Sequence, residues 1–146
     1  MSIKKDNKEC DISETNELRG DTGKSKNGIY LIQKHNATHL HYDMRLEMDD
    51  VLKSWALPKI PPIEKGVKRL AVQTEDHLVE YANFEGEIPE GTYGAGVVEI
   101  WDKGTYTIEE RENDKLVIYV KGKKLQGRFC LIKFKGQQKN WLFFKC

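Results

Sequence analysis

Four side chains that can bind a cation or an anion alternate along one short segment of the sequence. They are His39, His41, Asp43 and Arg45. On an extended strand, alternate side chains point to the same face, so these four share one face and the apolar residues between them share the other. Two imidazoles and a carboxylate that converge can bind a divalent metal ion, and a guanidinium beside them suits an anion such as phosphate. The segment therefore predicts a metal-dependent phosphoesterase.

The metal ligands that we expect are His35, His41 and Asp43. His41 and Asp43 would lie side by side on one strand, and His35, beyond a break at Asn36, would approach from the neighbouring segment. So dense a group of ionisable side chains needs a partner if it is buried, which favours a metal site over unrelated surface residues. His39 has the same parity, but three protein ligands already leave the open coordination positions that a catalytic metal needs.

A second set of polar side chains could bind phosphate next to this metal. Arg45 would either pair with a neighbouring carboxylate or bind two oxygens of a phosphate group. His77 would be a surface residue or, if its loop folds over the metal, would bind phosphate or protonate the leaving oxygen, flanked by Glu75 and Tyr81. The candidates for a wider phosphate-binding surface, each of which could equally be solvated, are Ser54, Lys59 and Arg69.

Composition places few limits on the partner of this protein. Its 146 residues suit one domain, and the net charge of +1 excludes a wholly basic nucleic-acid coat but allows a local positive groove. The cysteines, Cys10, Cys130 and Cys146, include no Cys-x-x-Cys pair, so we expect neither disulfides nor a zinc ribbon, and a reducing cytoplasm. We find no apolar run that could span a membrane or act as a leader, and expect no membrane partner.

Short alternating segments separated by turn residues run through most of the chain. We expect residues 1–27, which are polar and aperiodic, to form a mobile arm, and residues 28–146 to form one domain. The expected strands cover residues 29–32, 38–47, 51–57, 69–74, 97–101, 104–108, 115–120, 127–134 and 141–144, with a hairpin turn at Asp49 and Asp50. This pattern predicts an all-β fold with little helix. A compact antiparallel β-barrel is favoured over a sandwich because closure leaves no open edge.

Several blocks of sequence resemble one known protein family. They occur in order between residues 30 and 106, and they are Gln33-Lys34-His35, Leu40-His41-Tyr42-Asp43, Arg45-Leu46-Glu47, Leu52-Lys53-Ser54-Trp55-Ala56, Pro58-Lys59, Arg69-Leu70-Ala71-Val72, Glu75-Asp76-His77, Tyr81-Ala82, Phe84-Glu85-Gly86 and Gly91-Thr92-Tyr93-Gly94-Ala95-Gly96. Together they are similar to the 3′-phosphoesterase module of bacterial DNA ligase D, an end-healing enzyme of DNA non-homologous end joining that archaea also have as a free-standing protein.

This resemblance implies a compact β-barrel that binds Mn²⁺, or another divalent cation such as Co²⁺ or Zn²⁺, through His35, His41 and Asp43. The residues that match positions holding the scissile phosphate are Arg45, His77 and Tyr81, and those that match further active-site positions are Glu75, Arg69, Lys59 and Ser54. The family acts on DNA 3′ ends: a diesterase step removes a terminal ribonucleoside and leaves a 3′-phosphate, which a monoesterase step converts to 3′-OH. DNA polymerase and ligase partners would act in trans.

The sequence departs from the family pattern in three places. Met44 and Asp50 replace a usual phenylalanine and a usual glycine, changes that we expect to be tolerated. Residues 11–18 follow the family only loosely, so no role is assigned to Asp11 or Glu17. Part of this segment is nevertheless a candidate to pack over the barrel when DNA is bound.

Two other functions remain open. His41, Asp43 and a distant His77 would imitate the two-histidine, one-carboxylate site of a non-haem Fe(II) oxygenase, in which His35 would not be a ligand. Alternatively, the chain would be a non-catalytic module that recognises DNA ends through its basic side chains.

Overall fold

The computed structural model describes residues 27–88 and 96–146. The arm expected at residues 1–27, apart from its last residue, and the segment 11–18 within it lie outside the described residues. The elements are β1 (Asn27–Asn36), β2 (Leu40–Met48), β3 (Val51–Leu57), β4 (Lys68–His77), the short 3₁₀ helix η1 (Val79–Asn83), β5 (Gly86–Ile88), β6 (Gly96–Glu112), β7 (Lys115–Lys121), β8 (Gln126–Lys133) and β9 (Asn140–Lys145). In the described ranges, no helix is long and apolar enough to cross a membrane.

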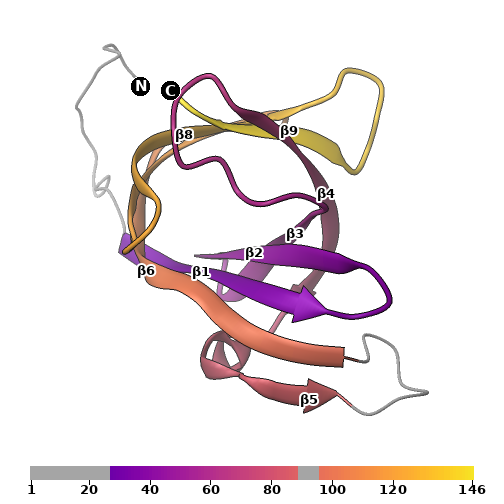
Figure 1. The fold of residues 1–146 in the computed structure, drawn as a ribbon. Helices are drawn as coiled ribbons and strands as arrows, with labels where there is room; N and C mark the ends of the chain where they lie inside the picture. Colours follow the sequence, from indigo (N-terminus) through magenta and orange to yellow (C-terminus); the bar gives the residue numbers. More distant parts are fainter. Residues whose placement is uncertain (1–26, 89–95) are drawn as a thin grey trace.

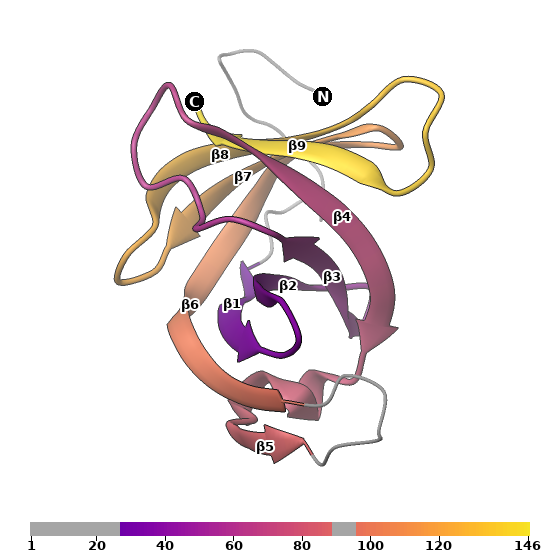
Figure 2. The same ribbon diagram turned by 45° about the vertical axis from the view of Figure 1, so that its right-hand side comes forward.

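Eight of the described strands form a closed antiparallel barrel. The strand order is β1-β2-β3-β4-β9-β8-β7-β6, and pairing of β1 with β6 closes the ring. Figure 1 and Figure 2 show this ring, with η1 and β5 together at one end of it. β5 pairs only with the start of β6 and so lies outside the ring. The predicted all-β barrel with little helix is therefore confirmed.

Alternate residues of the strands fill the barrel interior. In β2, Tyr42, Met44 and Leu46 are buried in the main core, where they join residues of β7, β8 and β9 such as Phe129. The side chains between them in β2 therefore point away from this core, because successive residues of a strand face opposite sides of the sheet. The outer face of the barrel is thus the one that carries the candidate site.

The hairpin between β2 and β3 follows the sequence prediction. Asp49 and Asp50 both have positive φ, 57° and 69°, and Met48 pairs with Val51 across them. Two consecutive residues of positive φ make the turn type that matches the twist of antiparallel strands, and aspartate tolerates this conformation better than most residues. Asp50 therefore replaces the glycine of the family pattern without loss of the turn.

Several strands are longer than the sequence predicts: β1 covers Asn27–Asn36 where residues 29–32 were expected, and β6 and β4 are longer for the following reasons. β6 is continuous where we expected two strands, because Gly104 does not end a strand but allows a close approach to β7: a Cβ there would overlap the carbonyl oxygen of Lys121. β4 continues to His77, which is its last residue and not part of a loop after the strand. Strand pairing, which a single segment cannot reveal, extends these elements.

A buried carboxylate joins two distant parts of the barrel. Asp102, in β6, accepts hydrogen bonds from the Tyr30 hydroxyl at 2.8 Å and from the backbone N–H of Leu125 at 2.9 Å. The N–H groups of Lys123 and Lys124 bind its other oxygen at 2.9 and 3.0 Å. These bonds satisfy the buried charge and fix the turn between β7 and β8 against β1.

The cysteine prediction was wrong. Cys130 in β8 and Cys146 form a disulfide, with their Cα atoms 6.5 Å apart. β8 and β9 are antiparallel neighbours, Cys130 lies opposite Phe144, and the N–H of Cys146 donates to the carbonyl oxygen of Arg128, so the two cysteines are diagonal neighbours on one face of the hairpin. Their separation of 16 residues gave no sign of this, because the distance depends on the register of the hairpin.

Candidate metal and phosphate site

The site lies on the outer face of β1, β2 and β3. The register sets His35 opposite His41, and Arg45 opposite Ser54. Because alternate residues share a face, Asp43 lies between these two rows, with Gln33 as its neighbour on β1. The predicted alternation of β2 thus puts all of these polar groups on one face.

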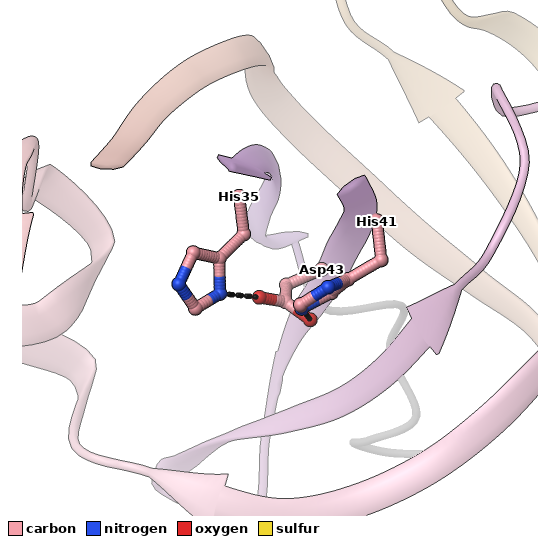
Figure 3. A group of neighbouring side chains, drawn as sticks. All are labelled: His35, His41 and Asp43. Carbon is pink, nitrogen blue, oxygen red and sulfur yellow. Dashed lines mark ion pairs between the residues drawn. The ribbon is translucent and has the colours of Figure 1, made fainter. Parts of the chain in front are cut away.

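His35, His41 and Asp43 form one compact group (Figure 3). The Nδ1 atom of His35 lies 3.5 Å from one oxygen of Asp43, and the Nε2 atom of His41 lies 3.2 Å from the other. One potential ligand atom from each residue lies within 4.8 Å of the others. The structure therefore brings the three expected ligands together, around the carboxylate.

Hydrogen bonds and nearby charges shift the pKa values of His41 and Asp43. The hydrogen bond with Asp43 raises the pKa of His41, although burial opposes this. Burial alone would raise the pKa of Asp43, but the hydrogen bond from His41 and the charges of His41 and Arg45 outweigh it, so that this pKa is lowered. Asp43 is therefore an anion at neutral pH.

The surroundings of the two imidazoles fit a divalent metal ion. The Nδ1 atom of His41 lies 3.2 Å from the backbone oxygen of His39, the second contact that commonly orients a metal-binding histidine. His35 is buried, and its Nε2 atom has no hydrogen-bond partner in the described part of the chain. The Nδ1 atom of the same ring is the one that faces Asp43, so Nδ1 is the atom that would bind the ion (Figure 3). Two imidazoles and one carboxylate suit Mn²⁺, Co²⁺ or Zn²⁺, while His39 itself is exposed.

Arg45 is buried beside this group and is held on three sides. Its Nε donates to the side-chain oxygen of Gln33 at 2.8 Å, and its Nη1 donates to Ser54 Oγ at 2.7 Å. Its Nη2 lies 3.7 Å from the carboxylate of Asp43. Burial lowers the pKa of Arg45, and the Asp43 charge opposes this, but a guanidinium remains charged in proteins. A fixed positive charge therefore lies next to the candidate metal ligands.

His77 and Tyr81 approach the same guanidinium from the end of β4 and from η1. The Nδ1 atom of His77 lies 3.1 Å from Arg45 Nη1 and 3.1 Å from the backbone oxygen of Glu75. The Tyr81 ring lies 5.0 Å from the guanidinium carbon and 5.0 Å from the His77 ring. Burial and the charge of Arg45 lower the pKa of His77, so its imidazole is neutral at pH 7. The side chain of Glu75 is exposed, and its contact with His77 is made by the backbone.

The wider phosphate-binding candidates separate into two places. Ser54 is fully buried, accepts from Arg45 and donates to the backbone oxygen of Leu52, so its contacts hold the guanidinium. Lys59 and Arg69 line a second pocket, near the start of β4, and Arg69 donates to a backbone oxygen of the loop after β3. Within the described ranges, neither makes a hydrogen bond or ion pair with Arg45.

Comparison with known proteins gives the family. Residues 33–133, more than half of the chain, match the family described as the DNA ligase D 3′-phosphoesterase domain. The chain belongs to this family. The family that the sequence motifs resemble is thereby confirmed.

The relatives of this phosphoesterase-family chain are much longer proteins. The "multifunctional non-homologous end joining protein LigD" of Pseudomonas aeruginosa is 50% identical over 123 residues, which are 80% of this chain and 15% of that protein. The "multifunctional non-homologous end joining DNA repair protein LigD" of Mycobacterium tuberculosis is 48% identical over 117 residues, 77% of this chain and 15% of that protein. A LigD protein of Mycolicibacterium smegmatis is 45% identical over 127 residues. The chain thus spans about 15% of the length of these curated relatives.

One residue of the phosphoesterase-family site was not assigned a role from the sequence. Gln33 is fully buried, accepts from Arg45 Nε and donates through its own amide to the backbone oxygen of Phe84 at 3.0 Å. It therefore joins the guanidinium to the segment that follows η1. Its parity with His35 was visible in the sequence, but its contact with Arg45 depends on the pairing of β1 with β2.

The geometry also bears on the oxygenase alternative. In the described part of the chain, the third member of the group around His41 and Asp43 is His35, whereas His77 lies beside Arg45. The particular triad that the sequence suggested for an Fe(II) oxygenase, with His77 as a ligand in place of His35, is therefore not the one that the fold forms.

Proposed function

We propose that this chain is a metal-dependent phosphoesterase that heals DNA 3′ ends during non-homologous end joining. It would remove a 3′-terminal ribonucleoside as a phosphodiesterase, and then the remaining 3′-phosphate as a phosphomonoesterase, to give a 3′-OH. The observation that carries the proposal is the burial of Arg45 next to Asp43, since it sets an anion-binding group beside a group that suits a cation.

The proposed metal ligands are His35, His41 and Asp43, with Mn²⁺, Co²⁺ or Zn²⁺ as the ion. When bound, such an ion polarises a phosphoryl oxygen and lowers the pKa of a coordinated water. Arg45 would bind a non-bridging oxygen of the phosphate, and its bonds to Gln33 and Ser54 hold it in place before the substrate arrives. The protein part of the site is thus preorganised.

The proposed role of His77 follows from its protonation state. A neutral imidazole is a poor acid, so the lowered pKa of His77 favours a hydrogen bond to the phosphate over protonation of the leaving oxygen. Tyr81, whose ring lies against the guanidinium, would add a hydroxyl donor to the same phosphate. Lys59 and Arg69 would contact the DNA farther from the reacting phosphorus, and Glu75 would act through its backbone oxygen, which lies 3.1 Å from His77 Nδ1.

The two steps differ in the bond that breaks. In the diesterase step, a water oxygen bonds to phosphorus, the bond from phosphorus to the 5′ oxygen of the terminal ribonucleoside breaks, and that oxygen takes up a proton. In the monoesterase step, a second water attacks phosphorus, the bond to the 3′ oxygen of the DNA breaks, and that oxygen is protonated as inorganic phosphate leaves. A DNA polymerase and a DNA ligase acting in trans would then use the 3′-OH.

The test is an end-processing assay on labelled primer-template DNA that ends in one ribonucleotide. With Mn²⁺, Co²⁺ or Zn²⁺, we expect a primer shortened by one nucleoside and ending in phosphate, followed by the 3′-OH product, and we expect no product with EDTA. His41→Ala should lose both steps, whereas Asp76→Asn, which alters an exposed carboxylate paired with Lys53, should retain them. Binding of the DNA by the wild type without either product would leave the non-catalytic DNA-end module as the function.

A further inference from the structure

A pocket that none of the roles above uses adjoins His77. Its volume is about 500 Å³, it is open to solvent, and it is lined by His77, Leu78, Glu80, Tyr81, Asn83 and Phe84. Most of this lining is apolar, and Leu78 is 71% exposed, more than any other large apolar residue that the structure describes. Apolar side chains exposed together around a concave surface indicate a binding site more often than a structural need.

The pocket is continuous with the candidate phosphate site. The ring of Tyr81 lies 5.0 Å from the guanidinium carbon of Arg45 and is stacked on Phe84, with centroids 5.0 Å apart and planes 11° from parallel. The carbonyl oxygen of Phe84 is held by Gln33, which also holds Arg45. A group bound in the pocket would therefore be within a few covalent bonds of a phosphate bound at Arg45.

We propose, resting on the function proposed above, that this pocket holds the nucleobase of the 3′-terminal ribonucleoside, the group that the diesterase step removes. Aromatic rings and apolar side chains bind a base through its flat face, whatever its sequence. A volume near 500 Å³ is in the range of pockets that hold small organic ligands, so one nucleoside can be accommodated.

Charge favours the terminal nucleoside over the strand that is retained. Among the described residues that line the pocket there is a glutamate, Glu80, and no lysine or arginine. The terminal nucleoside carries no phosphate other than the scissile one, whereas the retained strand adds one negative charge with each nucleotide. The ammonium of Lys103 bonds to the side-chain oxygen of Asn83 at the rim of the pocket, so the pocket holds one carboxylate and one nearby cation. A site with so little net charge suits an uncharged nucleoside better than a strand that adds a phosphate with each nucleotide.

The basic residues lie at the other end of the same strand. β4 begins with Lys68 and Arg69, which line the second pocket with Lys59, and it ends with His77 beside the apolar pocket. The two ends of this strand are roughly 30 Å apart along its length. The reacting phosphate would lie near the His77 end, because the Nη1 atom of Arg45 lies 3.1 Å from His77 Nδ1. Retained phosphates would thus run toward Lys59, and the leaving nucleoside toward the apolar pocket.

The two steps of the proposed reaction supply an internal control. A DNA end that carries a 3′-phosphate has already lost its terminal nucleoside, so the pocket has no ligand in the monoesterase step. For Leu78→Ala we expect the ratio of the diesterase kcat/KM to the monoesterase kcat/KM to fall about tenfold, mainly through the diesterase KM, because part of the stacking surface is lost. Ile132→Ala, which removes a different exposed aliphatic side chain, on β8, should leave the ratio unchanged.

A substrate change tests the same contact from the other side. DNA ending in a terminal ribose without a base should lower the diesterase kcat/KM of the wild type about tenfold and that of Leu78→Ala by much less. The proposal would be overturned if Leu78→Ala left the ratio of the diesterase to the monoesterase kcat/KM unchanged, including by an equal loss of both steps. It would also be overturned if the abasic end had equal effects on the wild type and on Leu78→Ala.

A binding measurement separates the pocket from the reaction. In EDTA, where the proposed function allows no turnover, 2-aminopurine placed as the 3′-terminal riboside should be quenched on binding to the wild type, because stacking on an aromatic ring quenches it, and quenched less by Leu78→Ala. The same fluorophore placed three nucleotides into the retained strand should show no difference between the two proteins. Equal quenching of the terminal base by both proteins would refute the pocket even if the enzyme were active, and inactivity with selective quenching would refute only the proposed reaction.

Discussion

The guanidinium of Arg45 lies 3.7 Å from the carboxylate of Asp43, whose oxygens also face both imidazoles of the candidate metal group. The carboxylate therefore connects the part of the site that suits a cation with the part that suits an anion. With a divalent ion in place, one carboxylate and one guanidinium would leave a net charge of two positive units, which matches a phosphate monoester dianion. The same Asp43 would thus be required for both the metal and the substrate.

Asp43→Asn should remove most of the metal affinity of the protein. The variant keeps the shape of the side chain but loses the negative charge that balances the divalent ion. We expect the Kd for Mn²⁺ to rise roughly 100-fold or more, because the loss of a direct ligand should cost more affinity than the loss of a residue that only orients a ligand. Isothermal titration of the metal-free protein measures this directly. The control is Asp76→Asn, which removes an exposed carboxylate elsewhere, and an unchanged Kd in Asp43→Asn would contradict the proposed ligand set.

Gln33→Ala should affect both stability and activity. It leaves the Nε of Arg45 and the carbonyl oxygen of Phe84 without their buried partners, so the free energy of unfolding should fall by about 1–3 kcal/mol. The kcat of both phosphoesterase steps should also fall, because the guanidinium of Arg45 would no longer be held in place by Gln33. Urea unfolding and the end-processing assay measure the two effects. Gln126→Ala, which removes a side-chain bond to Gly122 away from the site, should lower stability less and leave kcat unchanged, and equal kcat in Gln33→Ala would refute the role of Gln33.

Alternation along a strand was enough to predict half of the site. The even residues of segment 40–46 are apolar and the odd residues are ionisable, which fixes the face of β2 whatever its neighbours are. The number of short strands was also enough to predict the barrel, because a sheet of that size avoids open edges by closing. His35 was expected for a different reason, because a break at Asn36 would let the preceding segment approach His41 and Asp43.

Alternation along one strand could not predict the contacts between side chains of different strands. The bonds from Gln33 to Arg45 and from Ser54 to Arg45 depend on register, and a shift of one residue would have turned each side chain to the other face. The apolar pocket could not be predicted from the sequence, because it depends on where η1 lies and the five residues of η1 show no helical period. Lys59 and Arg69 were grouped with the site because their charges suited phosphate, whereas the fold sets them near the far end of β4.

Stability should fall at alkaline pH because of two buried tyrosines. Burial raises the pKa of both Tyr30 and Tyr106, and the charge of Asp102 adds to this effect at Tyr30. A phenol whose pKa is raised by folding contributes its full stability below the unfolded pKa, about 10, and loses it as the pH rises further. The free energy of unfolding should therefore decrease above pH 10, by up to about 1.4 kcal/mol per pH unit for each group.

Tyr106→Phe isolates one of these two tyrosines. This variant loses the hydrogen bond from the Tyr106 hydroxyl to the backbone oxygen of Glu47, so it should be less stable at neutral pH. Above pH 10, however, the slope of its unfolding free energy against pH should be shallower than that of the wild type by up to about 1.4 kcal/mol per pH unit. Urea unfolding between pH 8 and about 11 measures the slope. Equal slopes in the wild type and in Tyr106→Phe would contradict the burial effect.

Reduction of the Cys130–Cys146 disulfide should destabilise the barrel without changing the site. The bond closes a loop of 16 residues between β8 and β9, and loops of this length typically contribute about 3 kcal/mol to the free energy of unfolding. Urea unfolding with and without dithiothreitol should show this difference in the wild type and in Cys10→Ser, which keeps the pair, whereas Cys130→Ser should be insensitive to the reductant. Phosphoesterase activity should persist after reduction, because β8 and β9 carry none of the candidate site residues. If dithiothreitol left the unfolding of the wild type unchanged, the two thiols would be free in solution and the sequence-based expectation of no disulfide would stand.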